Sequence, residues 1–364
     1  MKRIAIWGHS GGYGGVERMI YNFYKYMDKS NIQYDFLVPH NYGKIAFEDE
    51  ILAMGGRVFR ILYSEGESLI KSRRTWKQYF KENPEVIGVH LHTYFPYAFP
   101  LKMAKKAGIN IRIFHAHGSV EEQSSQSIIS KIKTRIVKKE IDKYPTKYAA
   151  CGELAAKSFF GEKDYIWIKN GIEISKFGFD EDKRASIRSK YNIKDDDIVV
   201  GQIGHLSNVK QPLFTIEVVE EALKKNNNIK LLLVGDGPLA EEVKKTIEEK
   251  KLNNNILLLG SMSDVSDIYQ AIDCLTLPSL QEGFPVVLVE AQTAGVRCLV
   301  SNNVTEQVIQ TDLCEMVDIN SKEKWVESIV NCQPVDDRKK YQDNMLSKGF
   351  DIADITKKIE ELYK

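Results

Sequence analysis

Two carboxylates lie on either side of an expected strand-to-helix turn in the segment PSLQEGFPVVLVEAQTAG, residues 278–295. They are Glu282 and Glu290, and seven residues separate them. Glu290 falls inside an otherwise apolar helical stretch, where a carboxylate must find hydrogen-bond donors. The two hydroxyls of a ribose would provide such donors, whereas a solvated helix face or an ion pair is the plain structural alternative.

The residues between these carboxylates favour a ligand at a helix N-terminus. Gly283 frees the backbone, and Pro285 suits the first helical position because no hydrogen-bond partner is needed for its nitrogen there. The N–H groups of Gly283 and Phe284 can then reach a ligand at the start of the helix. The turn is therefore the strongest candidate site in the sequence.

Two other turns are rich in glycine. GHSGGYGGVERMI, residues 8–20, places Gly14 and Gly15 before an amphipathic helix, where backbone N–H groups could approach a phosphate or a sugar. A tight turn explains the same glycines equally well. GDGPLA, residues 235–240, satisfies the G-x-G-x-x-A pattern of nicotinamide enzymes, but it follows the second strand of its half and no acidic residue closes the next strand.

Metal binding is not expected from the sequence. His90 and His92 end one expected strand and His115 and His117 end another, but no carboxylate shares their spacing. An Asp-x-Asp pattern within residues 195–197 lies before a strand rather than after one, so it is interpreted as a solvated turn.

Short apolar or β-branched runs alternate with longer amphipathic stretches in both halves of the chain, as in βαβ units around a parallel sheet. The strands are expected at 3–7, 34–38, 57–61, 86–91, 111–115, 147–151, 165–168, 197–203, 229–234, 255–260, 273–277 and 297–301. The pattern predicts an α/β protein with two Rossmann-like domains. Open sheets of this kind bind ligands at their C-terminal edges, so a cleft between the two domains is expected to hold the ligand.

The domain boundary is expected in KNGIEISKF, residues 169–177, where an Asn-Gly pair favours a turn. Residues 1–170 would form the first domain and residues 171–345 the second. Residues 346–364 would form a C-terminal helix that can pack back on the first domain.

Composition excludes several protein classes. The chain has 364 residues, of which 43% are hydrophobic, enough for two cores. No apolar run is long enough to span a bilayer or to form a signal peptide, so a cytoplasmic location is expected. The five cysteines lack C-x-x-C spacing and are interpreted as small buried hydrophobes rather than as a disulfide framework or a zinc site. No nucleic-acid partner is expected.

The segment at 278–295 resembles the signature of the retaining glycosyltransferases of family four, which include bacterial polysaccharide enzymes and have the GT-B fold. The resemblance covers nearly the whole chain, because further segments match in order and spacing: 11–20, 169–177, 231–239 and 257–279. It implies two Rossmann-like domains whose parallel sheets face an inter-domain cleft, an acceptor-side domain first and a nucleotide-sugar-binding domain second.

The resemblance also implies roles for individual residues. Glu282 would contact the transferred hexose, and Glu290 the ribose hydroxyls. The diphosphate would be bound by Lys210 and by His205, which stands where the family usually has an arginine. The histidine near the donor sugar would be His117, with His115 as the alternative, so the implied catalytic residues are His117, Glu282 and Lys210. The implied donor-binding residues further include Gly14, Gly15, Gly235, Ser261, Met262, Ser263, Gly283, Phe284 and Pro285.

The activity implied by this resemblance is transfer of a hexose from a UDP-sugar to a hydroxyl acceptor, such as a polyprenyl-linked saccharide in capsular or exopolysaccharide synthesis. Neither metal nor cofactor is implied, because Lys210, helix N-termini and backbone amides would stabilise the leaving diphosphate. A catalytically silent GT-B module and a nicotinamide-dependent dehydrogenase remain the alternatives.

Charge is distributed unevenly along the chain. Residues 1–170 hold 27 Lys and Arg against 17 Asp and Glu, whereas the remainder holds 24 against 33. The segments 128–141 and 69–80 combine cations with apolar residues at helical spacing, as in helices that lie on anionic membranes. Peripheral contact with the inner face of the cell membrane is therefore a second expectation, with solvated cations over a core-packed helix as its alternative.

Overall fold

The computed structural model describes residues 1–9, 12, 14–62, 68–118 and 128–364. The chain separates into two units, one containing Met1–Gly171 together with Ile352–Lys364 and the other containing Ile172–Asp351. The C-terminal helix α14 (Ile352–Leu362) thus belongs to the first unit. The preceding helix, α13 (Lys340–Ser347), stays in the second, because it packs on α11 (Val286–Thr293).

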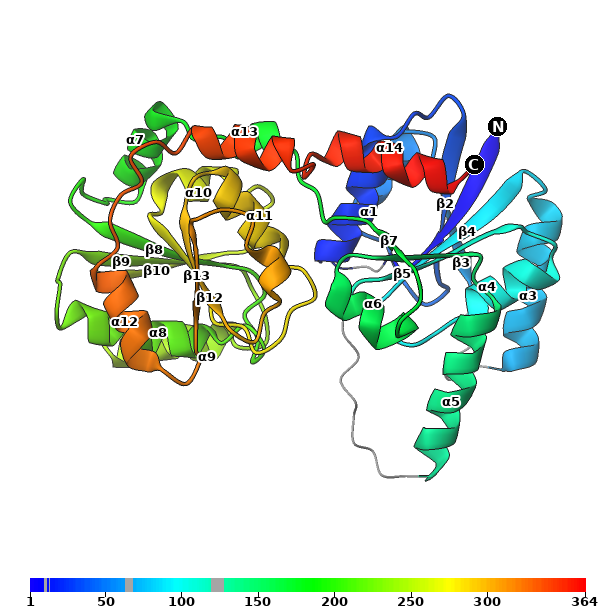
Figure 1. Ribbon diagram of the computed structural model, residues 1–364, viewed down its shortest axis with the longest axis horizontal. Coiled ribbons are helices and arrows are strands. Elements are labelled where there is room, and N and C mark those ends of the chain that lie inside the picture. The colour runs from blue at the N-terminus through cyan, green and yellow to red at the C-terminus, as the bar shows by residue number, and fades with distance from the viewer. Residues whose placement is uncertain (10–11, 13, 63–67, 119–127) are drawn as a thin grey trace. The chain divides into compact units, whose positions relative to one another are not determined.

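A parallel sheet organises the first unit, with its strands in the order β3-β2-β1-β4-β5-β6-β7 (Figure 1). The strands are β1 (Lys2–Trp7), β2 (Ile32–Pro39), β3 (Arg57–Ile61), β4 (Val86–Thr93), β5 (Ile111–Ala116), β6 (Lys147–Ala150) and β7 (Ile166–Trp167). Its helices, besides α14, are α1 (Gly15–Tyr26), α2 (Glu48–Ala53), α3 (Leu69–Glu82), α4 (Phe99–Lys106), α5 (Ile128–Lys143) and α6 (Glu153–Phe160).

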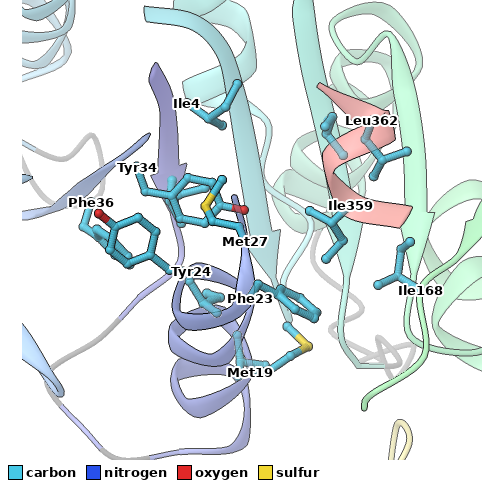
Figure 2. Close-up of a cluster of buried hydrophobic side chains, with 14 of the residues drawn as sticks. Ile4, Met19, Phe23, Tyr24, Met27, Tyr34, Phe36, Ile168, Ile359 and Leu362 are labelled. Carbon is cyan, nitrogen blue, oxygen red and sulfur yellow. The ribbon is translucent and has the colours of Figure 1, made fainter. Parts of the chain in front are cut away.

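Apolar residues at a spacing of three or four explain why α14 joins this unit. Helix α14 packs on α1, and each buries an apolar stripe in one shared core cluster. Figure 2 shows Ile359 and Leu362 of α14 in the same cluster as Phe23 of α1 and Ile4 of β1. Burying one such side chain contributes about 1.5–3 kcal/mol. Tyr363, directly after this helix, packs against β2, where its hydroxyl lies 2.7 Å from that of Tyr34.

The second unit is built around another parallel sheet, in the order β10-β9-β8-β11-β12-β13 (Figure 1). Its strands are β8 (Ile198–Ile203), β9 (Ile229–Val234), β10 (Ile256–Gly260), β11 (Cys274–Leu277), β12 (Arg297–Ser301) and β13 (Cys314–Val317). The helices besides α11 and α13 are η1 (Ile174–Lys176), α7 (Glu181–Lys190), α8 (Pro212–Leu223), α9 (Ala240–Glu249), α10 (Ser266–Ala271), η2 (Glu306–Val308) and α12 (Lys322–Val330).

Both units confirm the predicted fold class, an α/β protein with two Rossmann-like parallel sheets. Strand β13 was not anticipated, because it lies at the sheet edge and three of its four residues are partly or fully exposed, so it lacks the apolar run of an inner strand. In the described part of the chain, no helix is long and apolar enough to cross a membrane.

Strand order reverses at one point in each sheet. Chain connections leave β1 towards β2 on one side and reach β4 on the other, and β8 lies in the same way between β9 and β11. Open α/β sheets bind ligands outside the carboxyl ends of the strands at such points. The loops after β1 and β4, and those after β8 and β11, are therefore where ligand-binding residues are expected.

Candidate functional site

Two oppositely charged side chains meet at the reversal point of the second sheet. Lys210, in the loop after β8, forms an ion pair with Glu282, in the loop after β11, and both side chains are half-buried. The backbone N–H of Leu280 donates to the carbonyl of Val209 at 2.9 Å, which ties the same two loops together. The structure thus brings together two predicted site residues that lie far apart in the sequence.

Glu290 lies in a buried polar contact rather than on a solvated helix face. Its side chain belongs to α11 and is 9% exposed, and the Tyr269 hydroxyl of α10 donates to its Oε2 at 2.7 Å. Burial, together with the neighbouring Glu290 carboxylate, raises the pKa of Tyr269 well above its ordinary value. Tyr269 therefore remains protonated and keeps one carboxylate oxygen in a fixed position.

The turn before α11 differs by one residue from the expectation. The helix begins at Val286, and Pro285 is its N-cap, with φ −72° and ψ 116°, rather than its first helical residue. Phe284 is buried and stacks on Phe350 with 6.1 Å between the ring centroids, so its side chain belongs to the core. Gly283 is half-buried in the preceding bend. What this turn can offer a ligand is consequently backbone N–H groups at the start of a helix.

The glycines of GDGPLA are required by packing between loops. Gly235 has φ +142°, and a Cβ added to it would lie 1.8 Å from the carbonyl oxygen of Gly204. Gly237 has φ +159°, and its added Cβ would lie 2.5 Å from the carbonyl oxygen of Leu206. The loop after β9 is thus pressed against the loop after β8, which explains this glycine pattern without a dinucleotide.

The remaining predicted residues of this unit lie in loops at the same edge of the sheet. His205 follows β8 and is exposed. Ser261 and Ser263 are exposed and Met262 is half-buried in the loop after β10. These loops follow the carboxyl ends of neighbouring strands, so backbone and side-chain groups of both can face one ligand.

Sequence reasoning missed three polar residues near these loops. Tyr269 is one of them, and its role depends on a helix that is 21 residues away from Glu290 in the sequence. Ser279 is fully buried just after β11, and its hydroxyl has no hydrogen-bond partner within the described part of the chain. Gln202 donates from Nε2 to the carbonyl of Lys210 at 2.7 Å, while its Oε1 has no partner among the residues described by the structure. Buried polar atoms without partners are uncommon, and a bound ligand is one explanation for them.

In the first unit, the loop after β1 lies directly against the end of β4. Gly8 has φ +114°, and an added Cβ would lie 2.1 Å from the carbonyl oxygen of His92. Gly14 is the N-cap of α1, and Gly15 is its first residue, both exposed. Gly11 and Tyr13 of the same turn lie outside the described residues.

Four buried histidines form a stack on one face of β4 and β5, where His92 and His115 are register partners. His92 Nδ1 lies 2.9 Å from His117 Nε2, and His90 Nε2 lies 3.1 Å from His115 Nδ1. His90 Nδ1 in turn lies 2.8 Å from the Tyr363 hydroxyl of the C-terminal segment. We name these four residues the histidine stack.

Burial keeps the histidine stack uncharged. Loss of solvation lowers the pKa of His90 and that of His117 to about 3. It also lowers the pKa values of His92 and His115 well below the ordinary value of 6.5. Among the residues that the structure describes, His117 Nδ1 and His115 Nε2 have no hydrogen-bond partner. His117, the predicted sugar-side histidine, thus presents a neutral imidazole with an unused polar atom.

The histidine stack also bears on metal binding. The candidate ligand atoms of His90, His92 and His115 lie within 4.8 Å of one another. However, the rings of His90 and His92 are stacked with 4.0 Å between their centroids, and those of His90 and His115 with 5.3 Å. Ring nitrogens of this stack already pair with one another, so a metal ion would have to displace these contacts.

Two family models match the chain. The one described as Glycosyltransferase Family 4 matches residues 13–149, and the one described as Glycosyl transferases group 1 matches residues 183–344. The two matches fall in the first and the second unit, respectively.

Curated proteins are similar over most or part of the chain. The glycosyltransferase EpsF of Bacillus subtilis (strain 168) is 30% identical over 300 residues, which cover 81% of this chain and 78% of that protein. The UDP-Gal:alpha-D-GlcNAc-diphosphoundecaprenol alpha-1,3-galactosyltransferase of Escherichia coli is 29% identical over 204 residues, covering 54% and 53%. Among solved structures, Anabaena Alr3699/HepE in complex with UDP and glucose has a TM-score of 0.77 at 17% identity, covering 99% of this chain and 98% of that one.

Proposed function

Because this chain belongs to the family 4 glycosyltransferases with the GT-B fold, we propose that it is a retaining enzyme that moves a hexose from a UDP-sugar to a hydroxyl acceptor. The observation that carries the proposal is the Lys210–Glu282 ion pair at the reversal point of the second sheet. It sets a cation for a diphosphate beside a carboxylate that can accept hydrogen bonds from sugar hydroxyls.

The nucleotide is proposed to bind along the loops of the second unit. Lys210 and His205 face the diphosphate, together with N–H groups at the start of α11. Glu290 accepts hydrogen bonds from the ribose hydroxyls while the Tyr269 hydroxyl donates to its Oε2. The backbone of residues 261–263 lines the base. A diphosphate that draws Lys210 towards itself also leaves Glu282 available to the hexose.

The reaction is proposed to need no protein nucleophile. As the bond to the diphosphate breaks, the sugar becomes oxocarbenium-like, and the acceptor hydroxyl attacks from the face that the diphosphate leaves. Its proton passes to the departing phosphate oxygen. Lys210 stabilises the charge on the leaving diphosphate, so no metal ion or cofactor is assigned a role. His117 is proposed to contact the sugar as a neutral hydrogen-bonding group, consistent with its lowered pKa and unused Nδ1.

The acceptor is proposed to be a lipid-linked saccharide in polysaccharide synthesis. The Escherichia coli relative is named for an acceptor on diphosphoundecaprenol. Such an acceptor lies at a membrane, which suits a peripheral location at the inner face of the cell membrane.

Exposed surfaces of the first unit support this location. On α3, Leu69 and Ile70 are exposed together with Arg73 and Arg74, whereas Trp76 is fully buried and belongs to the core. On α5, Ile136 is 52% exposed beside the exposed cations Arg135, Lys138 and Lys139. The side chains of residues 128–134, which include Ile128, Lys131, Ile132 and Lys133, lie outside the described part. Exposed apolar residues among cations fit an anionic membrane surface.

Thermal shift measurements with a panel of nucleoside diphosphates test the donor assignment, because a ligand that binds only the folded chain raises its melting temperature. UDP is expected to stabilise the wild-type protein most, and Lys210→Met should lose this shift. His205→Arg should enlarge it, because a guanidinium is always charged and can bind a phosphate through two parallel hydrogen bonds. If no nucleoside diphosphate shifts the melting temperature, the donor site is wrongly assigned. UDP binding without sugar transfer would instead favour a silent module.

A further inference from the structure

The C-terminal segment supplies a buried hydroxyl to the histidine stack. Helix α14 ends at Leu362, whose carbonyl accepts a hydrogen bond from Lys147 Nζ at 2.7 Å, so the end of this helix is tied to the start of β6. The next residue, Tyr363, is 3% exposed. Its ring meets the rings of His90 and Tyr34 edge-on, with 5.8 Å and 6.0 Å between the centroids. The Tyr363 hydroxyl therefore has a fixed place beside β4 and β2.

Three consecutive hydrogen bonds run from β2 through this hydroxyl to β4 and β5. The Tyr34 hydroxyl lies 2.7 Å from that of Tyr363, and the Tyr363 hydroxyl lies 2.8 Å from His90 Nδ1. On the other side of the ring, His90 Nε2 lies 3.1 Å from His115 Nδ1. None of the four residues is more than 3% exposed. We name Tyr34, Tyr363, His90 and His115 the tyrosine–histidine chain.

Burial keeps every member of the tyrosine–histidine chain uncharged near neutral pH. It lowers the pKa of His90 to about 3 and that of His115 well below its ordinary value. It raises the pKa values of Tyr34 and Tyr363 above their ordinary value. A tyrosine hydroxyl carries one proton, and a neutral imidazole carries one N–H. Each inner member can thus donate on one side only and must accept on the other, so all three hydrogen bonds point the same way.

The number of atoms left unpaired distinguishes the two possible directions. If Tyr34 is the first donor, every proton of the chain finds an acceptor except the N–H at His115 Nε2, which has no partner within the described part of the chain. If His115 is the first donor, its Nε2 still lacks a partner, and the Tyr34 proton has no acceptor among the described residues either. Buried polar atoms without partners are costly. The direction from Tyr34 to His115 leaves one such atom instead of two and is therefore favoured.

The chain ends against His117, the histidine assigned to the donor sugar. The rings of His115 and His117 have 4.2 Å between their centroids. On its other contact, His117 stacks on His92 at 5.1 Å and shares the 2.9 Å contact between ring nitrogens. The His115 ring cannot turn about its own axis without losing the hydrogen bond to His90. It therefore forms a fixed wall beside His117.

We propose that Tyr363 is a positioning residue for sugar transfer: its hydroxyl donates to His90, fixes His90 and His115 with their protons on Nε2, and so holds the His115 ring against His117. This role rests on the proposed function, in which His117 contacts the transferred hexose, whereas the proton positions do not depend on it. A small displacement of a group at the reacting centre can lower the rate by about 100-fold. A hydroxyl at the far end of the histidine stack therefore affects the chemical step without touching the substrate.

Neutron diffraction from crystals of the fully deuterated wild-type chain tests the proton positions directly. Deuterons should appear on Nε2 of both His90 and His115, and the Tyr363 hydroxyl deuteron should point to His90 Nδ1. A deuteron on Nδ1 of either ring would mean that the chain runs the other way, and would overturn the proposal. This measurement needs no variant to fold and no sugar transfer.

Two variants test the positioning role in steady-state transfer assays. Tyr363→Phe keeps the ring but leaves His90 without the donor that fixes its tautomer, so kcat should fall by about tenfold or more while the KM for the UDP-hexose stays within about twofold. Tyr34→Phe is the matched control: it removes a hydroxyl from the same 2.7 Å contact but leaves Tyr363 able to donate to His90, so both constants should stay near their wild-type values.

Equal losses of kcat in the two variants would show that the hydroxyls only stabilise the fold, and wild-type kcat in Tyr363→Phe would show that the hydroxyl does not act on transfer. Either result overturns the positioning role. Absence of transfer by the wild-type chain would instead refute the proposed function, and the positioning role with it, while the neutron result would still establish the direction of the tyrosine–histidine chain.

Discussion

Replacement of Glu290 by alanine tests the proposed contact between this carboxylate and the ribose of the donor. The carboxylate is 9% exposed and accepts a hydrogen bond from Tyr269 through Oε2. Its proposed role in the complex is to accept hydrogen bonds from the ribose. A hydrogen bond to a charged group contributes about 1.5–3 kcal/mol. Because the two ribose hydroxyls are well solvated in free UDP, we expect a loss of about 2–3 kcal/mol, which corresponds to roughly 30- to 150-fold in Kd.

Calorimetric titration with UDP measures this loss, and urea unfolding establishes that the variant is folded. Tyr269→Phe is the matched control, because it removes the 2.7 Å hydrogen bond to Glu290 but leaves the carboxylate in place. It should lower the free energy of unfolding by about 1–2 kcal/mol while changing the Kd for UDP by less than about fivefold. A folded Glu290→Ala protein that binds UDP as tightly as the wild type would refute the ribose assignment.

Three further outcomes follow from the geometry. Gly235→Ala should lower the free energy of unfolding by more than about 3 kcal/mol, since strain at φ +142° adds to the contact with Gly204; Gly260→Ala, at φ +69° with open space around it, should lose only about 1–2 kcal/mol in the same urea titration. In urea titrations, the free energy of unfolding should fall as pH drops from 6.5 towards about 3, because the unfolded chain binds protons that the buried His90 and His117 do not; His90→Gln should flatten this dependence. In liposome flotation, the protein should bind vesicles with anionic lipid and release in high salt, and reversing the charges of Lys138 and Lys139 should weaken binding, whereas equal recovery with neutral vesicles would exclude electrostatic docking.

The alternation of apolar runs and amphipathic stretches was enough to predict both parallel sheets. Inner strands such as β8 and β9 are buried on both faces and therefore appear in the sequence as continuous apolar runs. The edge strand β13 is largely exposed and has no such run, so it was not predicted. Local chemistry also placed the turn before α11, although the helix begins one residue later than expected, at Val286.

Contacts that cross the fold could not be predicted in this way. The partnership of Tyr269 with Glu290 depends on how α10 packs on α11, and the ion pair of Lys210 with Glu282 joins residues 72 positions apart. The sequence placed the four histidines at the ends of two strands, but only the strand register brings the two pairs into one stack.

Sugar transfer itself is the most direct test of the account. UDP-hexoses with a radiolabelled sugar are incubated with the wild-type protein and polyprenyl-diphosphate saccharide acceptors, and the product linkage is read by NMR. The account predicts release of UDP and a product that keeps the anomeric configuration of the donor, with Lys210→Met and Glu282→Gln each slowing transfer by about 100-fold or more. A product of inverted configuration would contradict the retaining mechanism, and transfer at the wild-type rate by both variants would contradict the site.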